Sequence, residues 1–119
     1  MILIKNGKII ENNELVLKDI LIDNGKIIDM GLFDNSDVNV IDASGCLVMP
    51  GAVDVHVHLR EPGFESKETV LTGTKSSAKG GVTTIMPMPN LKPCPDNLEH
   101  LTLELEILKR DALVNSYPY

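Results

Sequence analysis

The most informative stretch of this sequence reads Val53-Asp54-Val55-His56-Val57-His58-Leu59-Arg60. Side chains alternate between the two faces of a β-strand. One face would therefore carry the polar residues from Asp54 to Arg60, and the other the apolar residues from Val53 to Leu59. The apolar face predicts packing on that side, and two neighbouring imidazoles are costly to bury on the other without a purpose. The stretch predicts a metal-bearing strand of a barrel or parallel sheet, buried on both faces.

The two histidines are the candidate metal ligands. His56 and His58 share a predicted strand face, and neutral imidazole is a good ligand for Zn²⁺ and similar divalent ions. A zinc site takes three or four protein ligands, so this pair would supply only part of one. The alternative interpretation is a pair of hydrogen-bonded histidines in a polar strand.

Arg60 and Asn90 are the candidate substrate-binding residues. Each ends a predicted strand, at the end of the sheet where the active-site loops of a parallel α/β architecture begin. The Arg60 guanidinium suits bidentate recognition of a carboxylate, and the Asn90 amide can hydrogen-bond to a carboxylate or an amide. The alternatives are a surface ion pair of Arg60 with Glu61 or Glu65, and turn capping by Asn90.

Other polar residues receive simpler interpretations. Asp54 would orient a metal ligand or pair with a buried group, Cys94 would be a loop thiol near the pocket, and His100 would be a surface histidine. Three more side chains are predicted to be solvated helix charges: Lys67, Lys75 and Lys79.

Residues 1–50 are predicted to form short strands joined by tight turns. Asn6-Gly7 and Asn24-Gly25 are both hairpin signals, because a type I′ turn needs positive φ at its two central residues. Two such similar hairpins predict a small antiparallel sheet or sandwich.

Residues 51–119 change to a strand–helix–strand rhythm. We expect a helix over residues 66–79, a strand over 82–86, a second helix with Asp96 as its N-cap, and a third strand from 114. One stripe of the second helix is expected to face the core: Leu98, Leu101, Leu105, Leu108 and Ala112. Parallel strands joined by helices predict an α/β sheet or barrel. A closed (β/α)₈ barrel takes roughly 200 residues or more, so the 119 residues are predicted to be the front of a longer protein.

Composition excludes several function classes. The net charge of −6 and the scarcity of aromatic residues argue against nucleic acid or an anionic membrane as a partner. No apolar run approaches the ~18 residues of a membrane span, and the N-terminus lacks the features of a signal peptide. Cys46 and Cys94 stand far apart and predict neither a disulfide framework nor a zinc knuckle. A cytoplasmic location is expected.

Three segments together resemble dihydroorotases of the cyclic amidohydrolase superfamily. The segment from Pro50 to Phe64 resembles the first barrel strand and loop, Gly73 to Thr84 the following helix and turn, and Met86 to Asn90 the second-strand motif. The H-x-H pair alone marks the superfamily, whereas H-x-H-L-R-E-P-G together with M-P-N is far more specific to dihydroorotases. The resemblance implies an α/β fold in which residues 1–50 are part of a small β-sandwich. Residues 51–119 would be the first two and a half units of a (β/α)₈ TIM-type barrel.

The resemblance also implies a function. Dihydroorotases are metal-dependent hydrolases that interconvert L-dihydroorotate and N-carbamoyl-L-aspartate in pyrimidine biosynthesis, with one or two divalent ions, zinc above all. His56 and His58 would be metal ligands, and Arg60 and Asn90 would hold the substrate carboxylate. The remaining ligands and the catalytic aspartate come from later barrel strands, so these 119 residues would contain no catalytic residue of their own. A homo-oligomer is expected, with aspartate transcarbamoylase as a partner in some family members.

Two alternative functions remain open. Hydantoinases, dihydropyrimidinases and allantoinases are close relatives, but Arg60 and Asn90 count against them because their substrates lack this carboxylate arrangement. A non-catalytic scaffold or partner subunit is the alternative from another class, although such relatives usually lose metal ligands and this chain keeps His56 and His58.

Overall fold

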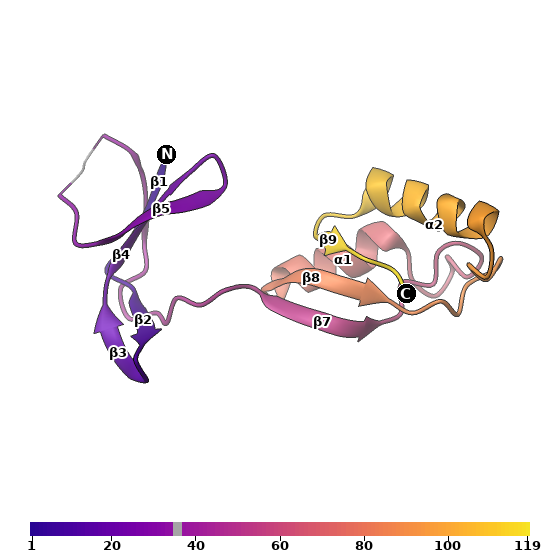
Figure 1. Ribbon diagram of the computed structural model, residues 1–119, viewed down its shortest axis with the longest axis horizontal. Coiled ribbons are helices and arrows are strands. Elements are labelled where there is room, and N and C mark those ends of the chain that lie inside the picture. The colour runs from indigo at the N-terminus through magenta and orange to yellow at the C-terminus, as the bar shows by residue number, and fades with distance from the viewer. Residues whose placement is uncertain (35–36) are drawn as a thin grey trace. The chain divides into compact units, whose positions relative to one another are not determined.

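The computed structural model describes residues 1–34 and 37–119. The described residues fall into two compact units, Met1–Pro50 and Gly51–Tyr119 (Figure 1). None of the helices in these residues has both the length and the apolar character needed to cross a membrane.

The first unit consists of short strands. They are β1 (Ile2–Lys5), β2 (Lys8–Glu11), β3 (Glu14–Leu17), β4 (Asp19–Asp23), β5 (Lys26–Gly31) and β6 (Asn39–Asp42). Four of them form one sheet in the order β5-β4-β1-β6, and β2 and β3 form a separate antiparallel ribbon. The predicted turn at Asn24-Gly25 is confirmed, because β4 and β5 pair across it and its φ values are 47° and 74°. A second turn with two positive φ values, at Asn12-Asn13, joins β2 to β3.

The predicted hairpin at Asn6-Gly7 is wrong. β1 pairs with β4 in antiparallel and with β6 in parallel orientation, and it does not pair with β2. The physical reason is that Val48, which is distant in sequence, packs tightly against Gly7. A Cβ added to Gly7 would lie 2.5 Å from Cγ2 of Val48. The segment after Asn6 therefore runs toward Val48 instead of folding back on β1, and the sheet is mixed instead of purely antiparallel.

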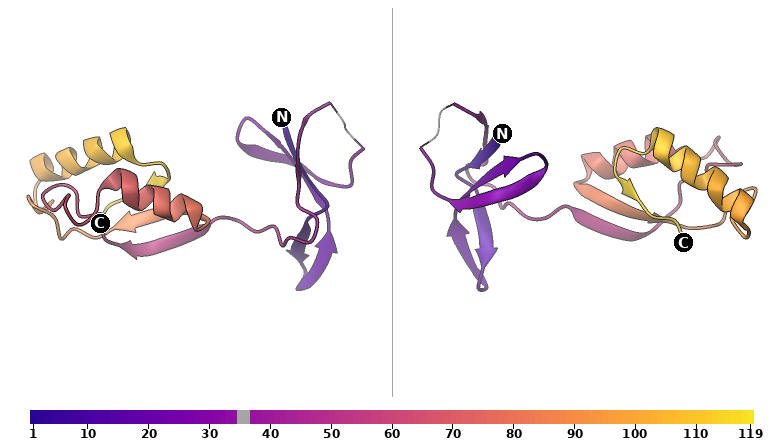
Figure 2. Two further views of the ribbon diagram at one scale, coloured as in Figure 1. Left: turned by 180° about the vertical axis from the view of Figure 1, so that it is seen from behind. Right: turned by 45° about the horizontal axis from the view of Figure 1, so that its top comes forward.

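The second unit is a three-stranded parallel sheet with two helices. Its elements are β7 (Ala52–Val57), α1 (Val70–Lys79), β8 (Val82–Pro87), α2 (Leu98–Asp111) and β9 (Asn115–Ser116), and the strand order is β7-β8-β9. The two views in Figure 2 show the helices lying alongside this sheet. One core cluster joins strand to helices: Leu59, Val70, Ile85, Ile107 and Leu108. The predicted strand–helix–strand order is thus confirmed.

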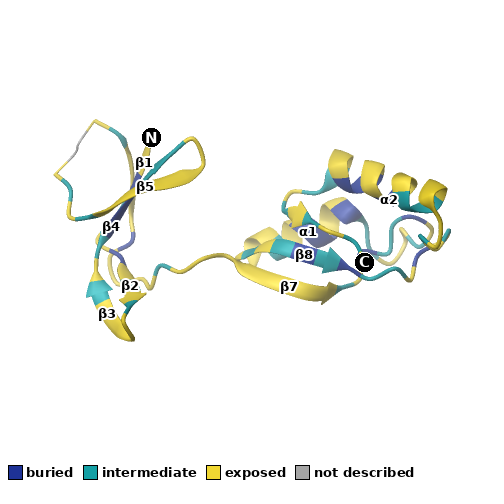
Figure 3. Ribbon diagram, in the orientation of Figure 1, coloured by how far each residue is buried: buried dark blue, intermediate teal, exposed yellow. Residues whose placement is uncertain are grey.

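β7 differs from the strand that the sequence predicts. It ends at Val57, before His58. Val53 and Val55 are 59% and 54% exposed, whereas Leu59 is buried in the core. Figure 3 shows β7 exposed along most of its length beside a more buried β8. The prediction of a strand buried on both faces is therefore wrong for the described residues, because the helices cover the sheet through β8 and the end of β7.

The start of α1 is set by an N-terminal cap and not by the apolar pattern of the helix. The helix begins at Val70, later than the predicted 66–79, because the Thr69 side chain accepts a hydrogen bond from the Thr72 N–H at 3.1 Å. The Thr72 hydroxyl accepts the Thr69 N–H at 3.1 Å in return. This reciprocal box satisfies donors that a helix start otherwise leaves unpaired, so Lys67 lies in the loop before the helix.

α2 also differs from its prediction. Its N-cap is Asn97, whose side chain accepts the His100 N–H at 3.0 Å, and not Asp96. The predicted leucine stripe is partly wrong, because Leu98 is 80% exposed and Leu105 is exposed too. The buried residues of this helix are Glu104, Ile107 and Leu108. The buried face is thus rotated toward Ile107, which places a carboxylic acid in the core.

Candidate active site

A β-bulge lies next to the first histidine. In the pairing of β7 with β8, Asp54 lies opposite Ile85 and Val57 lies opposite Pro87, so the register shifts between them. Such an extra residue bends a strand and re-aims its side chains. The exposed Asp54 accepts a hydrogen bond from the His56 N–H at 3.0 Å. Asp54 therefore shapes the backbone at the bulge, and its partner is not the buried group that the sequence suggested.

The two histidines are neighbours in space. The rings of His56 and His58 lie edge to face, with centroids 5.3 Å apart and planes inclined at 73°. His58 Nδ1 lies 2.8 Å from Oδ1 of Asn90. Because an amide oxygen only accepts hydrogen bonds, Nδ1 carries the proton in this arrangement. Nε2 of His58 then keeps the lone pair that a metal ion needs.

Arg60 lies in the loop that follows β7. It has a φ of 65°, in the left-handed region that residues with a side chain rarely adopt. Its carbonyl accepts the Phe64 N–H at 2.9 Å, and the Phe64 carbonyl accepts the Lys67 N–H at 2.9 Å. These two bonds wind residues 60–67 into consecutive turns at the end of the strand.

A second loop packs closely against these turns. The Lys92 N–H donates to the Pro62 carbonyl at 3.0 Å. Gly63 has a φ of 98°, and a Cβ added there would lie 2.2 Å from the Lys92 carbonyl oxygen. Only glycine fits this contact, which fixes the loop carrying Arg60 against the loop carrying Asn90.

The two loops enclose a groove of about 400 Å³, which we call the Arg60 groove. Its lining residues are Arg60, Phe64, Lys67, Pro89, Asn90, Leu91 and Cys94. Arg60 and Asn90, which the sequence singles out separately, therefore line one groove, with Cys94 at its border. Asn90 also contacts His58, so the groove adjoins the histidine pair.

The carboxylates nearest Arg60 in sequence are engaged elsewhere. Glu61 accepts the Val70 N–H at 2.9 Å and lies 3.7 Å from Arg110. Glu65 accepts the Gly63 N–H at 2.8 Å, and this hydrogen bond holds the pKa of Glu65 below its usual value. Within residues 1–34 and 37–119, Arg60 forms no ion pair with either one. The surface ion pair considered as the alternative role of Arg60 is thus wrong.

The histidine pair fits part of a metal site. Two imidazoles at this separation can act as two of the ligands that a divalent ion requires. The described part of the chain contains no group of three or more His, Cys, Asp and Glu side chains that could hold an ion. His56 and His58 could therefore supply only two of the ligands of a metal centre.

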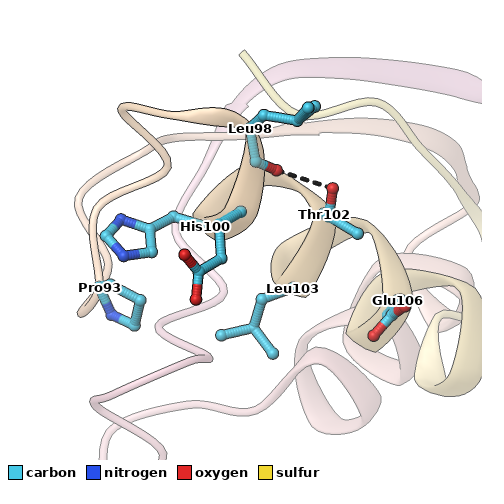
Figure 4. A pocket seen from close by; sticks show the side chains of 7 residues that line it. Pro93, Leu98, His100, Thr102, Leu103 and Glu106 are labelled. Atoms are coloured by element: carbon cyan, nitrogen blue, oxygen red, sulfur yellow. Dashed lines mark hydrogen bonds between the residues drawn. The ribbon is translucent and has the colours of Figure 1, made fainter.

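A larger hollow lies elsewhere, along α2 (Figure 4). It measures about 730 Å³ and is lined by Pro93, Leu98, Glu99, His100, Thr102, Leu103 and Glu106. His100 is held by the Cys94 carbonyl and the Asp96 carboxylate, at 2.9 and 3.1 Å from its Nδ1. Its side chain is 33% exposed, so it is only partly the surface histidine that the sequence predicts.

Lys67 is the charged residue of the groove that the sequence missed. Its position inside a predicted helix indicated a solvated charge, but it lies in the turns before Thr69 and lines the Arg60 groove. The signal that could have found it is the Thr69-Val70 step, where a threonine cap predicts a later helix start.

Comparison with known proteins identifies the family of this chain. The sequence model of the family described as dihydro-orotase-like matches residues 45–119, which is more than half of the chain. The chain belongs to the dihydro-orotase-like family. The predicted resemblance is thereby confirmed.

Individual relatives point to the same superfamily. The chain is 52% identical over 122 residues to a dihydroorotase of Staphylococcus aureus (strain Mu50 / ATCC 700699), covering 100% of the chain. It is 48% identical over 118 residues to a dihydroorotase of Macrococcus caseolyticus (strain JCSC5402), covering 98%. In both cases the chain spans 28% of the relative's length.

A solved structure shares the fold of this chain. The L-hydantoinase (dihydropyrimidinase) from Arthrobacter aurescens superposes with a TM-score of 0.90 at 27% sequence identity. The match covers 99% of this chain and 27% of the hydantoinase. The mixed α/β fold is therefore that of the corresponding part of a cyclic amidohydrolase.

Proposed function

We propose that the complete protein containing this chain is a dihydroorotase. It would hydrolyse L-dihydroorotate reversibly to N-carbamoyl-L-aspartate in pyrimidine biosynthesis. Residues 1–50 would belong to a small β-sandwich, and residues 51–119 would form the first units of a (β/α)₈ barrel. Homo-oligomerisation, a cytoplasmic location and aspartate transcarbamoylase as a partner stay predictions drawn from the sequence.

One observation carries this proposal: Arg60 and Asn90 line the same groove, and Asn90 also contacts His58. The Asn90 Oδ1 accepts from His58, which leaves its Nδ2 free to donate to a substrate carboxylate. The guanidinium group of Arg60 can bind a carboxylate through two parallel hydrogen bonds. A substrate with a carboxylate beside a scissile ring amide suits this arrangement.

His56 and His58 would hold a divalent ion, which we expect to be zinc, with one or two ions in the complete site. Such an ion supplies Lewis-acid polarisation of the amide carbonyl and a water of lowered pKa. The contribution of the chain is orientation, because the hydrogen bond from His58 to Asn90 fixes the imidazole tautomer. Partners of this kind are typical of metal-ligating histidines.

The variant Arg60→Met in the complete protein tests the carboxylate role. Removing a charged hydrogen-bonding partner should lower kcat/KM for dihydroorotate by roughly 100-fold or more, with an unchanged metal content. Arg110→Met is the matched control, since Arg110 lies on α2, pairs with Asp111 and Glu61, and does not line the groove. Wild-type kinetics in the Arg60 variant would exclude this role.

Hydantoin hydrolysis is the second candidate function, because the chain shares its fold with a solved L-hydantoinase. A hydantoinase would not need Arg60 for substrate binding, since hydantoin has no carboxylate. Activity on hydantoin that survives in Arg60→Met would favour this candidate. A complete absence of hydrolysis with metal bound would favour the non-catalytic scaffold.

A further inference from the structure

The Arg60 groove contains a second cationic side chain. Lys67 lines it together with Arg60 and Asn90. The lysine is held in place by its own backbone, since its N–H donates to the Phe64 carbonyl at 2.9 Å. Its Nζ lies 5.5 Å from the centre of the Phe64 ring, a distance at which an ammonium group is attracted to an aromatic face.

Nearby carboxylates do not neutralise this pair of cations. No acidic residue lines the groove. Glu61 and Glu65 bind backbone N–H groups, and Glu68 binds the Thr69 N–H and the Thr72 hydroxyl. Among residues 1–34 and 37–119, neither Arg60 nor Lys67 forms an ion pair with a carboxylate. The groove therefore has a net positive lining that favours anions.

We propose that Lys67 is a specificity-determining residue that adds a second positive charge to the carboxylate end of the groove. This inference rests on the proposed dihydroorotase function. Dihydroorotate carries one carboxylate and N-carbamoyl-aspartate carries two, whereas hydantoin carries none. Lys67 thus strengthens the binding of N-carbamoyl-aspartate most and that of dihydroorotate less. It does not strengthen the binding of hydantoin.

The test compares three variants of the complete metal-loaded protein: Lys67→Met, Lys67→Arg and Lys75→Met. Lys67 is exposed, and the hydrogen bond from its backbone N–H to the Phe64 carbonyl does not need the side chain, so Lys67→Met should fold. Lys75 is an exposed lysine on α1 outside the groove. The readouts are KM and kcat for both directions of the reaction and for hydantoin, at low and high salt.

For Lys67→Met we expect KM for N-carbamoyl-aspartate to rise roughly fivefold, and KM for dihydroorotate to rise less. The equilibrium constant of the reaction fixes the ratio of the two kcat/KM values, so kcat for ring closure should rise relative to kcat for ring opening. Any hydantoin hydrolysis should stay unchanged. Lys67→Arg should keep wild-type KM values because the charge is retained. Added salt should raise the wild-type KM for the dianion more than that of Lys67→Met, because salt screens exposed charges.

Different outcomes would exclude the role of Lys67 and the dihydroorotase activity of the protein. Wild-type KM values in Lys67→Met, beside a strong defect in Arg60→Met, would overturn the role of Lys67 alone. An equal rise of KM for hydantoin, or an equal effect of Lys75→Met, would also overturn it. A wild-type protein that neither binds nor converts either carboxylate substrate would overturn both proposals.

Discussion

At the scale of single residues, Glu104 is the most unusual side chain. It is 2% exposed, and neither of its carboxylate oxygens has a hydrogen-bond partner among the described residues. It shares the buried face of α2 with Ile107 and Leu108. Burial raises the pKa of Glu104 to about 7, because removal from water penalises the charged form.

This carboxyl should make stability depend on pH. Its pKa is higher in the folded than in the unfolded state, so the folded state binds more protons and stability falls as pH rises from about 4.5 to about 7. Glu104→Gln should stabilise the complete protein by up to about 3 kcal/mol at pH 8 and have little effect at pH 4. Urea unfolding at the two pH values measures this. Glu106→Gln, at an exposed position of the same helix, is the control, and equal effects of both variants would contradict the account.

Gly63 holds the loop of the Arg60 groove in place. Gly63→Ala would force a Cβ to within 2.2 Å of the Lys92 carbonyl oxygen at a φ of 98°. We expect a loss of about 2–4 kcal/mol of stability from strain and overpacking together. Gly81→Ala is the matched control, because Gly81 has a φ of 81° but nothing within 4 Å of the added Cβ. Chemical denaturation should show the larger loss at Gly63, and similar losses at both positions would contradict the close contact.

At the scale of elements, local signals succeeded where a single short segment decides the structure. Asn24-Gly25 predicted its hairpin, and the β-branched run after Gly81 predicted β8. Asn6-Gly7 failed because distant pairing of β1 with β6 outweighs the local turn preference. The alternation of residues 53–60 also failed at its apolar face, because neither a bulge nor the position of covering helices is encoded in a period of two.

The start of α2 provides a test at this scale. Asn97→Ala removes the side chain that accepts the hydrogen bond from the His100 N–H. The substitution should lower the free energy of unfolding by about 1 kcal/mol. Asp96→Ala should cost less, because Asp96 contacts the His100 ring and the Asn97 side chain and not a helix N–H. Thermal unfolding of both variants ranks the two residues. A larger loss of stability in Asp96→Ala than in Asn97→Ala would indicate that Asp96 is the N-cap, as the sequence predicts.

At the scale of the whole molecule, the sequence indicated which candidate site residues lie together better than it indicated their surroundings. The spacing of His56 and His58 and the position of Asn90 after β8 indicated which side chains come together. Lys67 escaped prediction because the Thr69 cap starts α1 later than the sequence pattern indicates. Phe64 escaped prediction because backbone hydrogen bonds within the loop, and not a periodic pattern, hold the turns that bring it to the groove.

Metal content of the complete protein is a prediction at this scale. His58→Ala should reduce bound zinc strongly, because it removes one of two adjacent imidazole ligands. His100→Ala should leave zinc content unchanged, since His100 lies at the start of α2 and bonds to Asp96 and Cys94. Equal zinc content in all three proteins, measured by elemental analysis, would exclude the histidine pair as ligands.

The most direct test of the central claim is the ratio of kcat/KM for L-dihydroorotate to kcat/KM for hydantoin, measured on the zinc-loaded complete protein. The groove that combines Arg60 and Asn90 beside His58 predicts a ratio far above one. A ratio below one, with zinc bound, would contradict the claim that this groove recognises a substrate carboxylate.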